Sequence, residues 1–157
     1  MKSAAMKRSE RIGAIADLEQ HESDAAARIL ADGQRVLRER ETVLAELRRY
    51  RDDYVNMGRL RSRSVSVIAF QDYQRFVARL DEAIAQQSRL VADAQLECDA
   101  RRNAWMAARG RAMSLEKAVA RCEDVERRSD ARREQWRLDE AAMRMTPRTR
   151  GGHEPTH

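Results

Sequence analysis

Apolar residues recur at alternating steps of three and four along most of the chain. This spacing is typical of the a and d positions of a coiled coil, where one stripe of a helix packs against a partner helix. In the first part of the chain it predicts a helix over about residues 5–57. The seam of this helix, meaning the stripe expected to face the partner, consists of Ile12, Ile15, Glu19, Glu22, Ala26, Ile29, Gly33, Val36, Arg40, Val43, Leu47, Tyr50, Tyr54 and Met57. Three leucines, Leu30, Leu37 and Leu44, run alongside this seam and widen it.

The same spacing resumes after a short interruption and predicts a second helix over about residues 67–142. Its seam consists of Phe70, Tyr73, Val77, Leu80, Ile84, Gln87, Val91, Ala94, Cys98, Arg101, Trp105, Ala108, Ala112, Leu115, Val119 and Cys122. The interruption, about residues 58–66, has the composition of a turn, and Ser64 or Ser66 is placed to cap the second helix. Residues 146–157 contain both prolines and a glycine pair, so a disordered tail is expected there.

Two long helices joined by a short turn predict an all-α fold, a long antiparallel two-helix coiled coil that forms a single hairpin over residues 1–145. In the register that best matches the two seams, Arg40 lies opposite Gln87 and Gly33 lies opposite Ala94. The two polar interruptions and the two small residues then face each other. Polar pairing of this kind fixes the register of coiled coils.

The second helix is expected to be longer than the first. Beyond about Cys122 it has no predicted partner within the chain, and its seam thins to polar residues with Trp136 and Met143 as late apolar positions. We therefore expect this overhang either to fray or to contact another protein.

The charge pattern limits the classes of partner. The chain has 31 basic and 26 acidic residues, a net charge of +5, and the two signs are interleaved. Interleaved charges are typical of solvated helix faces with ion pairs, whereas binding to phosphates needs a basic surface. No nucleic acid is expected as a partner, and a basic nucleic-acid-binding scaffold is kept as an alternative. No apolar run approaches the ~20 residues of a membrane helix, and no signal peptide is evident, which predicts a cytoplasmic protein.

No group of residues suggests catalysis. Of the three histidines, His153 and His157 lie in the tail, and no cysteine or carboxylate pair lies at metal-ligand spacing with His21. No glycine-rich phosphate loop is present. Cys98 and Cys122 are too far apart on one helix to pair, so reduced thiols are expected. The sequence therefore predicts a protein that is not an enzyme and has no cofactor.

All tyrosines and phenylalanines lie between residues 47 and 87, beside the predicted turn. Tyr50 and Tyr54 fall on the first seam, where they either close the end of the coil or present a docking surface. Phe76 falls off the second seam, in a stripe with Leu80, Ala83 and Gln87, and a two-helix coil offers nothing to bury it. An exposed apolar stripe usually marks a partner site.

Three stretches, LRRYRDDYVNMG (47–58), FQDYQRFVARLDEAIAQQ (70–87) and RNAWMAARGRAMSLEKAVAR (102–121), resemble the flagellar export protein FliJ family in order and spacing. The resemblance implies a component of the flagellar type III export apparatus whose hairpin is similar to the stalk of rotary ATPases. It implies that one end, about residues 5–25 and 110–140, sits in the export ATPase ring. It also implies contact with the cytoplasmic domain of the export gate protein and with export chaperones. The protein would be monomeric when alone and would meet the membrane only through the apparatus, at the cytoplasmic side of the inner membrane.

Carried over by position, the resemblance places the gate contact near the predicted turn. The implied residues are Leu47, Tyr50, Tyr54, Phe76, Leu80 and Ala83. Two alternatives share the fold: the equivalent stalk of a virulence-type injectisome, and a homodimeric coil that uses the overhang around Trp136.

Overall fold

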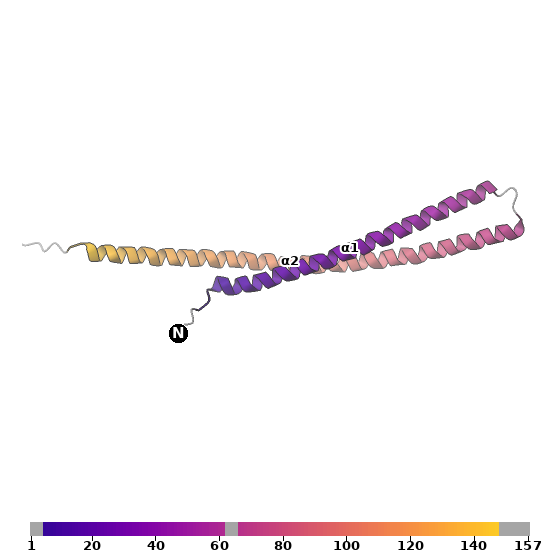
Figure 1. The fold of residues 1–157 in the computed structure, drawn as a ribbon. Helices are drawn as coiled ribbons and strands as arrows, with labels where there is room; N and C mark the ends of the chain where they lie inside the picture. The colour runs from indigo at the N-terminus through magenta and orange to yellow at the C-terminus, as the bar shows by residue number, and fades with distance from the viewer. Residues whose placement is uncertain (1–4, 62–65, 148–157) are drawn as a thin grey trace, which may run out of the picture. The chain divides into compact units, whose positions relative to one another are not determined.

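A computed structural model describes residues 5–61 and 66–147 of the chain. It contains two helices, α1 (Arg8–Arg61) and α2 (Val67–Met145), and no strand in the described ranges (Figure 1). The predicted all-α hairpin is confirmed. No helix in the described ranges is long and apolar enough to cross a membrane.

Each helix begins with a polar cap. At the start of α1, the Lys7 carbonyl accepts hydrogen bonds from the N–H groups of Glu10 and Arg11 at 3.1 and 3.2 Å. The Glu10 carboxylate in turn accepts the Lys7 N–H at 3.2 Å, which is the glutamate half of a capping box. At the start of α2, the Ser66 hydroxyl accepts the Ala69 N–H at 3.3 Å, so the predicted cap at Ser66 is confirmed.

The helix ends differ from those predicted. The expected first helix stopped at residue 57, but α1 continues to Arg61, so residues 58–61 are helical and do not form part of a turn. Gly58 does not adopt a positive φ, and the residues after it are good helix formers, so one glycine does not end the helix. At the other end, α2 reaches Met145 instead of residue 142. The alternative cap Ser64 lies outside the described residues.

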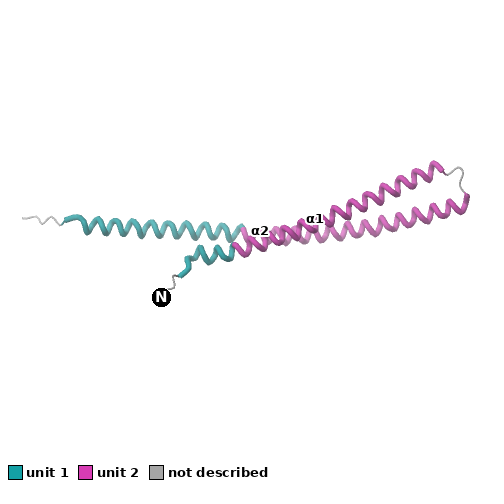
Figure 2. Tube along the Cα trace, viewed as in Figure 1, with its two compact units in different colours: residues 1–16, 113–157 teal, residues 17–112 magenta. Residues whose placement is uncertain are grey.

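The chain divides into two compact units, coloured separately in Figure 2. One consists of residues 17–112 and contains the antiparallel helices up to the ends that flank residues 62–65. The other consists of residues 1–16 and 113–157. The expectation of a single hairpin domain stays a prediction, as does the disorder of the tail, most of which (148–157) lies outside the described residues.

The seam of α2 is the one predicted, apart from Phe70 at its start. Leu80, Cys98, Ala108 and Ala112 are buried, and the intervening seam positions are half-buried. Cys98 is the most deeply buried side chain, at 1% exposure, and both cysteines are free thiols.

The seam of α1 is turned relative to the prediction. Along the predicted seam of α1, every second position is correct. Each position between these lies one residue before the residue that the structure buries. Leu30 and Leu44 are each 8% exposed, whereas the neighbouring Ile29 and Val43 are 54% and 43% exposed. Leu30 and Leu44, which were expected to run alongside the seam, therefore form it, and Ile29 and Val43 lie outside it.

Continuing the leucine series towards the C-terminal end of α1 gives a physical reason for this rotation. The next positions in phase are Arg51 and Gly58, which are half-buried. Arg51 forms an ion pair with Asp81 of α2, and Gly58 gives space to the ring of Tyr73. Continuing the series of β-branched residues (Ile29, Val36 and Val43) by seven residues would instead have buried Tyr50 at this end of α1.

The predicted register is confirmed at its polar pair. The side-chain amide of Gln87 donates to the Arg40 carbonyl at 2.9 Å, so the two polar interruptions face each other. Gly33, expected opposite Ala94, is covered by Arg101, whose Cδ would lie 3.0 Å from a Cβ added to the glycine. The Arg101 guanidinium reaches across α1 and donates to the Ile29 carbonyl at 2.9 Å.

In the unit that contains the N-terminus, α1 and α2 stay paired further than expected. The Glu126 carboxylate accepts the Ser9 hydroxyl at 2.6 Å and the Ser9 N–H at 3.1 Å, so a residue of α2 satisfies a free N–H at the start of α1. Lys7 and Asp130 lie 3.6 Å apart. The prediction that α2 lacks a partner beyond Cys122 is therefore wrong up to Asp130.

Candidate partner-binding site

Five aromatic side chains gather where α1 ends and α2 begins, and we call them the aromatic tip: Tyr50, Tyr54, Phe70, Tyr73 and Phe76. Tyr54 lies at the centre. Its ring stacks on Tyr73 of the facing helix, with centroids 5.3 Å apart and an interplanar angle of 14°, and contacts Phe76 at 4.5 Å. Aromatic pairs of this kind contribute about 0.5–1.5 kcal/mol each beyond their buried area.

The ring of Tyr73 depends on the glycine opposite it. A Cβ added to Gly58 would lie 2.3–2.6 Å from the outer atoms of the Tyr73 ring, so no larger residue fits at position 58 without displacing the ring. The Tyr73 hydroxyl donates to the Val55 carbonyl at 3.5 Å. A glycine and a tyrosine thus form a small-to-large pair that brings the two helix ends together.

The structure corrects the expectation for Phe76. A two-helix coil was expected to leave this ring without an intrachain contact. Phe76 is in fact half-buried, because Tyr54 packs against it and Tyr50 meets it edge-on at 6.2 Å. The error follows from the rotation of α1, which moves Tyr50 off the seam and onto the side where Phe76 lies.

The six residues implied by the resemblance differ in accessibility. Leu80 is buried at 8% exposure, and Leu47, Tyr54, Phe76 and Ala83 are half-buried. Tyr50 is 53% exposed and rests on Tyr54 and Phe76. Of the six, Tyr50 is therefore the residue that a partner reaches most readily, and Leu80 the one that it reaches least.

An ion pair fixes the helices beside these residues. The Arg51 guanidinium donates to the Asp81 carboxylate across the seam. This hydrogen bond, together with the charge of Asp81, raises the pKa of Arg51 above its ordinary value. The pair is partly exposed, so its contribution is to hold the register at the tip more than to stabilise the fold.

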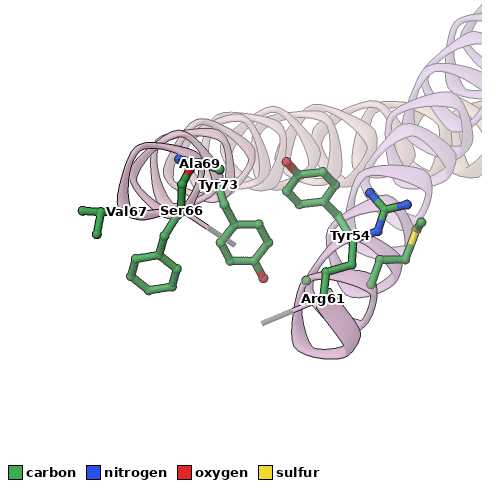
Figure 3. A pocket seen from close by; sticks show the side chains of 9 residues that line it. Tyr54, Arg61, Ser66, Val67, Ala69 and Tyr73 are labelled. Carbon is green, nitrogen blue, oxygen red and sulfur yellow. Dashed lines mark hydrogen bonds between the residues drawn. The ribbon is translucent and has the colours of Figure 1, made fainter. Parts of the chain in front are cut away.

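A cleft of about 560 Å³ opens between the last turn of α1 and the first turn of α2. Figure 3 shows Tyr54 and Tyr73 projecting into the space between the two helix ends. Its remaining lining residues are Met57, Gly58, Arg61, Ser66, Val67, Ala69 and Phe70. The sequence did not predict this cleft because residues 58–61 were assigned to a turn. The signal that could have indicated it was a glycine, Gly58, at a position opposite a large aromatic residue, Tyr73.

Among the described residues, no three His, Cys, Asp or Glu side chains are grouped so as to hold a metal ion. The aromatic tip is suited to contact a protein surface, since tyrosine combines apolar area with a polar hydroxyl group.

Comparison with known protein families decides the assignment. The family model described as Flagellar FliJ protein matches residues 8–151, a range that includes both helices and the segment between them. The chain belongs to the FliJ family. As a FliJ family member it is a component related to flagellar protein export, and the family match favours the flagellar system over an injectisome. A comparison with curated proteins found no match, and neither did a comparison with solved structures.

Proposed function

We propose that this FliJ family protein is a non-enzymatic stalk of the flagellar type III export apparatus. It sits in the export ATPase ring, links that ring to the cytoplasmic domain of the export gate protein, and engages export chaperones. It acts in the cytoplasm, at the inner membrane through its partners only, and is a monomer when alone. Family membership and an antiparallel pair of helices that ends in exposed aromatic residues support this role.

The gate contact is the part of the proposal with residue-level support. It comprises Leu47, Tyr50, Tyr54, Phe76, Leu80 and Ala83. The observation that carries it is the position of Tyr50, half-exposed and held edge-on against Phe76. Large aromatic side chains that are already fixed in place lose little conformational entropy on binding, which is why they are frequent at the centres of interfaces.

We assign the ring contact to about residues 5–25 and 110–140. There the helices carry charged residues on their outer faces, and the Ser9–Glu126 hydrogen bonds hold the start of α1 against α2. A paired arm of two helices is a better stalk than a single frayed helix, because relative movement of the helices is restricted.

Ion pairing weakens the nucleic-acid alternative. Arg35, Arg75, Arg102 and Arg127 each pair with a carboxylate three or four residues away on the same helix. Such arginines are already neutralised by their neighbours, and a phosphate backbone would have to compete with those carboxylates.

The test is binding to the cytoplasmic domain of the gate protein. Replacing Tyr50 with Ala removes the most accessible ring of the surface and is expected to weaken binding by at least about tenfold if it is a central contact. Leu96→Ala is the matched control, because Leu96 is 69% exposed on α2 and lies more than four turns beyond Leu80.

Far-UV circular dichroism of both variants must match the parent chain, since Tyr50 contributes little to the seam. A triple Ala variant that also replaces Tyr54 and Phe76 extends the test, with its lower stability measured separately. Unchanged gate affinity in the triple variant would refute the assigned surface, whereas equal losses in Tyr50→Ala and Leu96→Ala would point to a different one.

A further inference from the structure

The cleft between the end of α1 and the start of α2 has mostly apolar walls. They include the rings of Tyr54, Phe70 and Tyr73 and the thioether of Met57 (Figure 3). Its volume of about 560 Å³ lies within the range of roughly 300–1,000 Å³ that is usual for pockets that take drug-sized ligands. The cleft therefore has room for more than one side chain.

Apolar side chains also adjoin the cleft on both helices. Leu60, beside the lining residue Arg61 on α1, is 86% exposed, and Ile68 in the first turn of α2 is 72% exposed. Met57 and Phe70, which line the cleft, are themselves 53% and 52% exposed. Apolar contact area thus continues past the cleft onto both helices, which suits a segment of a protein better than a small molecule.

The cleft is positively charged, and nearby carboxylates do not balance it. Arg61 is the one charged side chain among the described lining residues, and it forms no ion pair with any described residue. Residues 54–71 contain three arginines and form the longest run of the sequence without aspartate or glutamate. Of the carboxylates that bound this run, Asp72 lies 3.9 Å from Arg75. Asp53 precedes Arg61 by more than two turns of α1, which is about 12 Å along the helix axis.

The helix dipoles do not reverse this sign. Arg61 lies in the last turn of α1, where its full charge exceeds the partial negative charge of about one half at a helix C-terminus. The first turn of α2 contains no acidic residue, so nothing there offsets the positive end of that dipole. The charge that complements the cleft is therefore negative.

We propose that this cleft binds a short segment of another protein in which phenylalanine or leucine is flanked by glutamate or aspartate. The apolar side chain packs against the rings of Phe70 and Tyr73, because aromatic walls favour a bulky apolar or aromatic group. The acidic neighbours pair with Arg61, whose guanidinium can bind a carboxylate through two parallel hydrogen bonds.

A second copy of this chain is the less favoured occupant. Two such helix ends would bring arginines together without a carboxylate between residues 54 and 71 of either copy, and like charges at an interface are unfavourable. The cleft shares only Tyr54 with the proposed gate surface, so the inference does not rest on the gate contact or on the stalk role.

The experiment uses the full chain and three synthetic peptides of about eight residues, long enough to fill a pocket of this size. The first has a central Phe-Leu pair flanked by glutamates, the second has lysines instead of the glutamates, and the third has alanines instead of the Phe-Leu pair. NMR titration is expected to show binding of the first peptide, weakened by salt, with shifts concentrated at the amides of residues 57–61 and 66–73. Binding of the other two is expected to be at least about tenfold weaker.

Matched variants locate the site. Phe70→Ala is expected to weaken binding of the first peptide by about tenfold or more, while Leu96→Ala, at a position 69% exposed elsewhere on α2, leaves it unchanged. Arg61→Gln is expected to weaken binding and reduce its salt dependence, while Arg89→Gln removes the same charge from another exposed position without effect. Arg61→Glu is expected to bind the lysine peptide in preference to the glutamate peptide. Far-UV circular dichroism of all variants should match the parent chain.

Four results would overturn the inference. Equal affinity for the glutamate and lysine peptides would exclude acidic specificity, and binding that survives both Phe70→Ala and Arg61→Gln would place the peptide elsewhere on the chain. A concentration-dependent dimer in sedimentation that Phe70→Ala abolishes would identify a second copy as the occupant. Binding to phosphatidylglycerol vesicles that Arg61→Gln abolishes, without binding of the glutamate peptide, would identify a lipid surface instead.

Discussion

Neighbouring residues on α1 offer a direct test of which side of the helix is buried. Leu44 is 8% exposed and Val43 is 43% exposed, although both are apolar and both follow the heptad spacing. The structure predicts that Leu44→Ala destabilises the protein strongly and that Val43→Ala hardly does. The seam written from sequence alone predicts the reverse order.

The expected magnitudes follow from buried area. Leu→Ala removes about three methylene equivalents at about 0.8 kcal/mol each, and nearly all of that surface is buried at Leu44, which gives a loss of about 2 kcal/mol. Val→Ala removes about two such groups, of which little more than half is buried at Val43, a loss of about 0.9 kcal/mol. Alanine regains about 0.6 kcal/mol of helix propensity over valine, so the net loss for Val43→Ala is about 0.3 kcal/mol.

The assay is urea unfolding followed by far-UV circular dichroism, with the slope of the transition compared between variants. An unchanged slope means that the shift in midpoint reports stability and not a change in the denatured state. Leu30→Ala and Ile29→Ala repeat the comparison, at 8% and 54% exposure, two heptads earlier. The rotation of α1 would be refuted if the Val43 and Ile29 variants lost as much stability as the two leucine variants.

Two further predictions concern the glycines and the N-terminal end. Gly110→Ala is expected to stabilise the protein by up to about 1 kcal/mol, because nothing lies near the added Cβ. The stability of the Gly58→Ala variant is expected to lie about 1–2 kcal/mol below that of Gly110→Ala, because the added Cβ displaces the ring of Tyr73 from its stack. Equal gains in stability for the two variants in thermal unfolding would contradict this. The hydrogen bonds from Ser9 lower the pKa of Glu126 from its ordinary value of 4.5, so their stabilisation is present above that pH and is lost as the pH falls through the lowered folded value. Ser9→Ala should therefore lose stability relative to the parent near neutral pH and match it in acid, as measured by urea unfolding across pH, and a difference that persists in acid would exclude this cause.

The sequence predicted the features that depend on spacing alone. The seam of α2 is unambiguous because few of its neighbouring positions compete with it. The cap at Ser66 and the pairing of Arg40 with Gln87 followed from simple rules of helix ends and polar matching, and both are present. On α1, by contrast, Ile29 and Leu30 compete for the same place in the heptad, and so do Val43 and Leu44.

Such a tie cannot be resolved from one helix, because both series have the right period and similar hydrophobicity. The choice between the two series depends on the last residue of each, at the C-terminal end of α1, because that residue must pack against the start of α2. The leucine series ends in Gly58, which admits the Tyr73 ring, and the β-branched series ends in Met57, which would have filled that space. Contacts between residues distant in sequence therefore set the rotation of the whole of α1.

The same rotation decides what the tip can present to a partner. Had Tyr50 been on the seam, Phe76 would have stood alone and exposed, as a flexible contact. With α1 turned, Tyr50 lies outside and packs edge-on against Phe76, while Tyr54 holds both from the inside. The exposed residue of the proposed gate surface is then Tyr50, supported by a fixed aromatic layer, and the accessible ring is ordered before any partner arrives. A surface of this kind loses little entropy on binding, which favours a defined contact over a loose apolar patch.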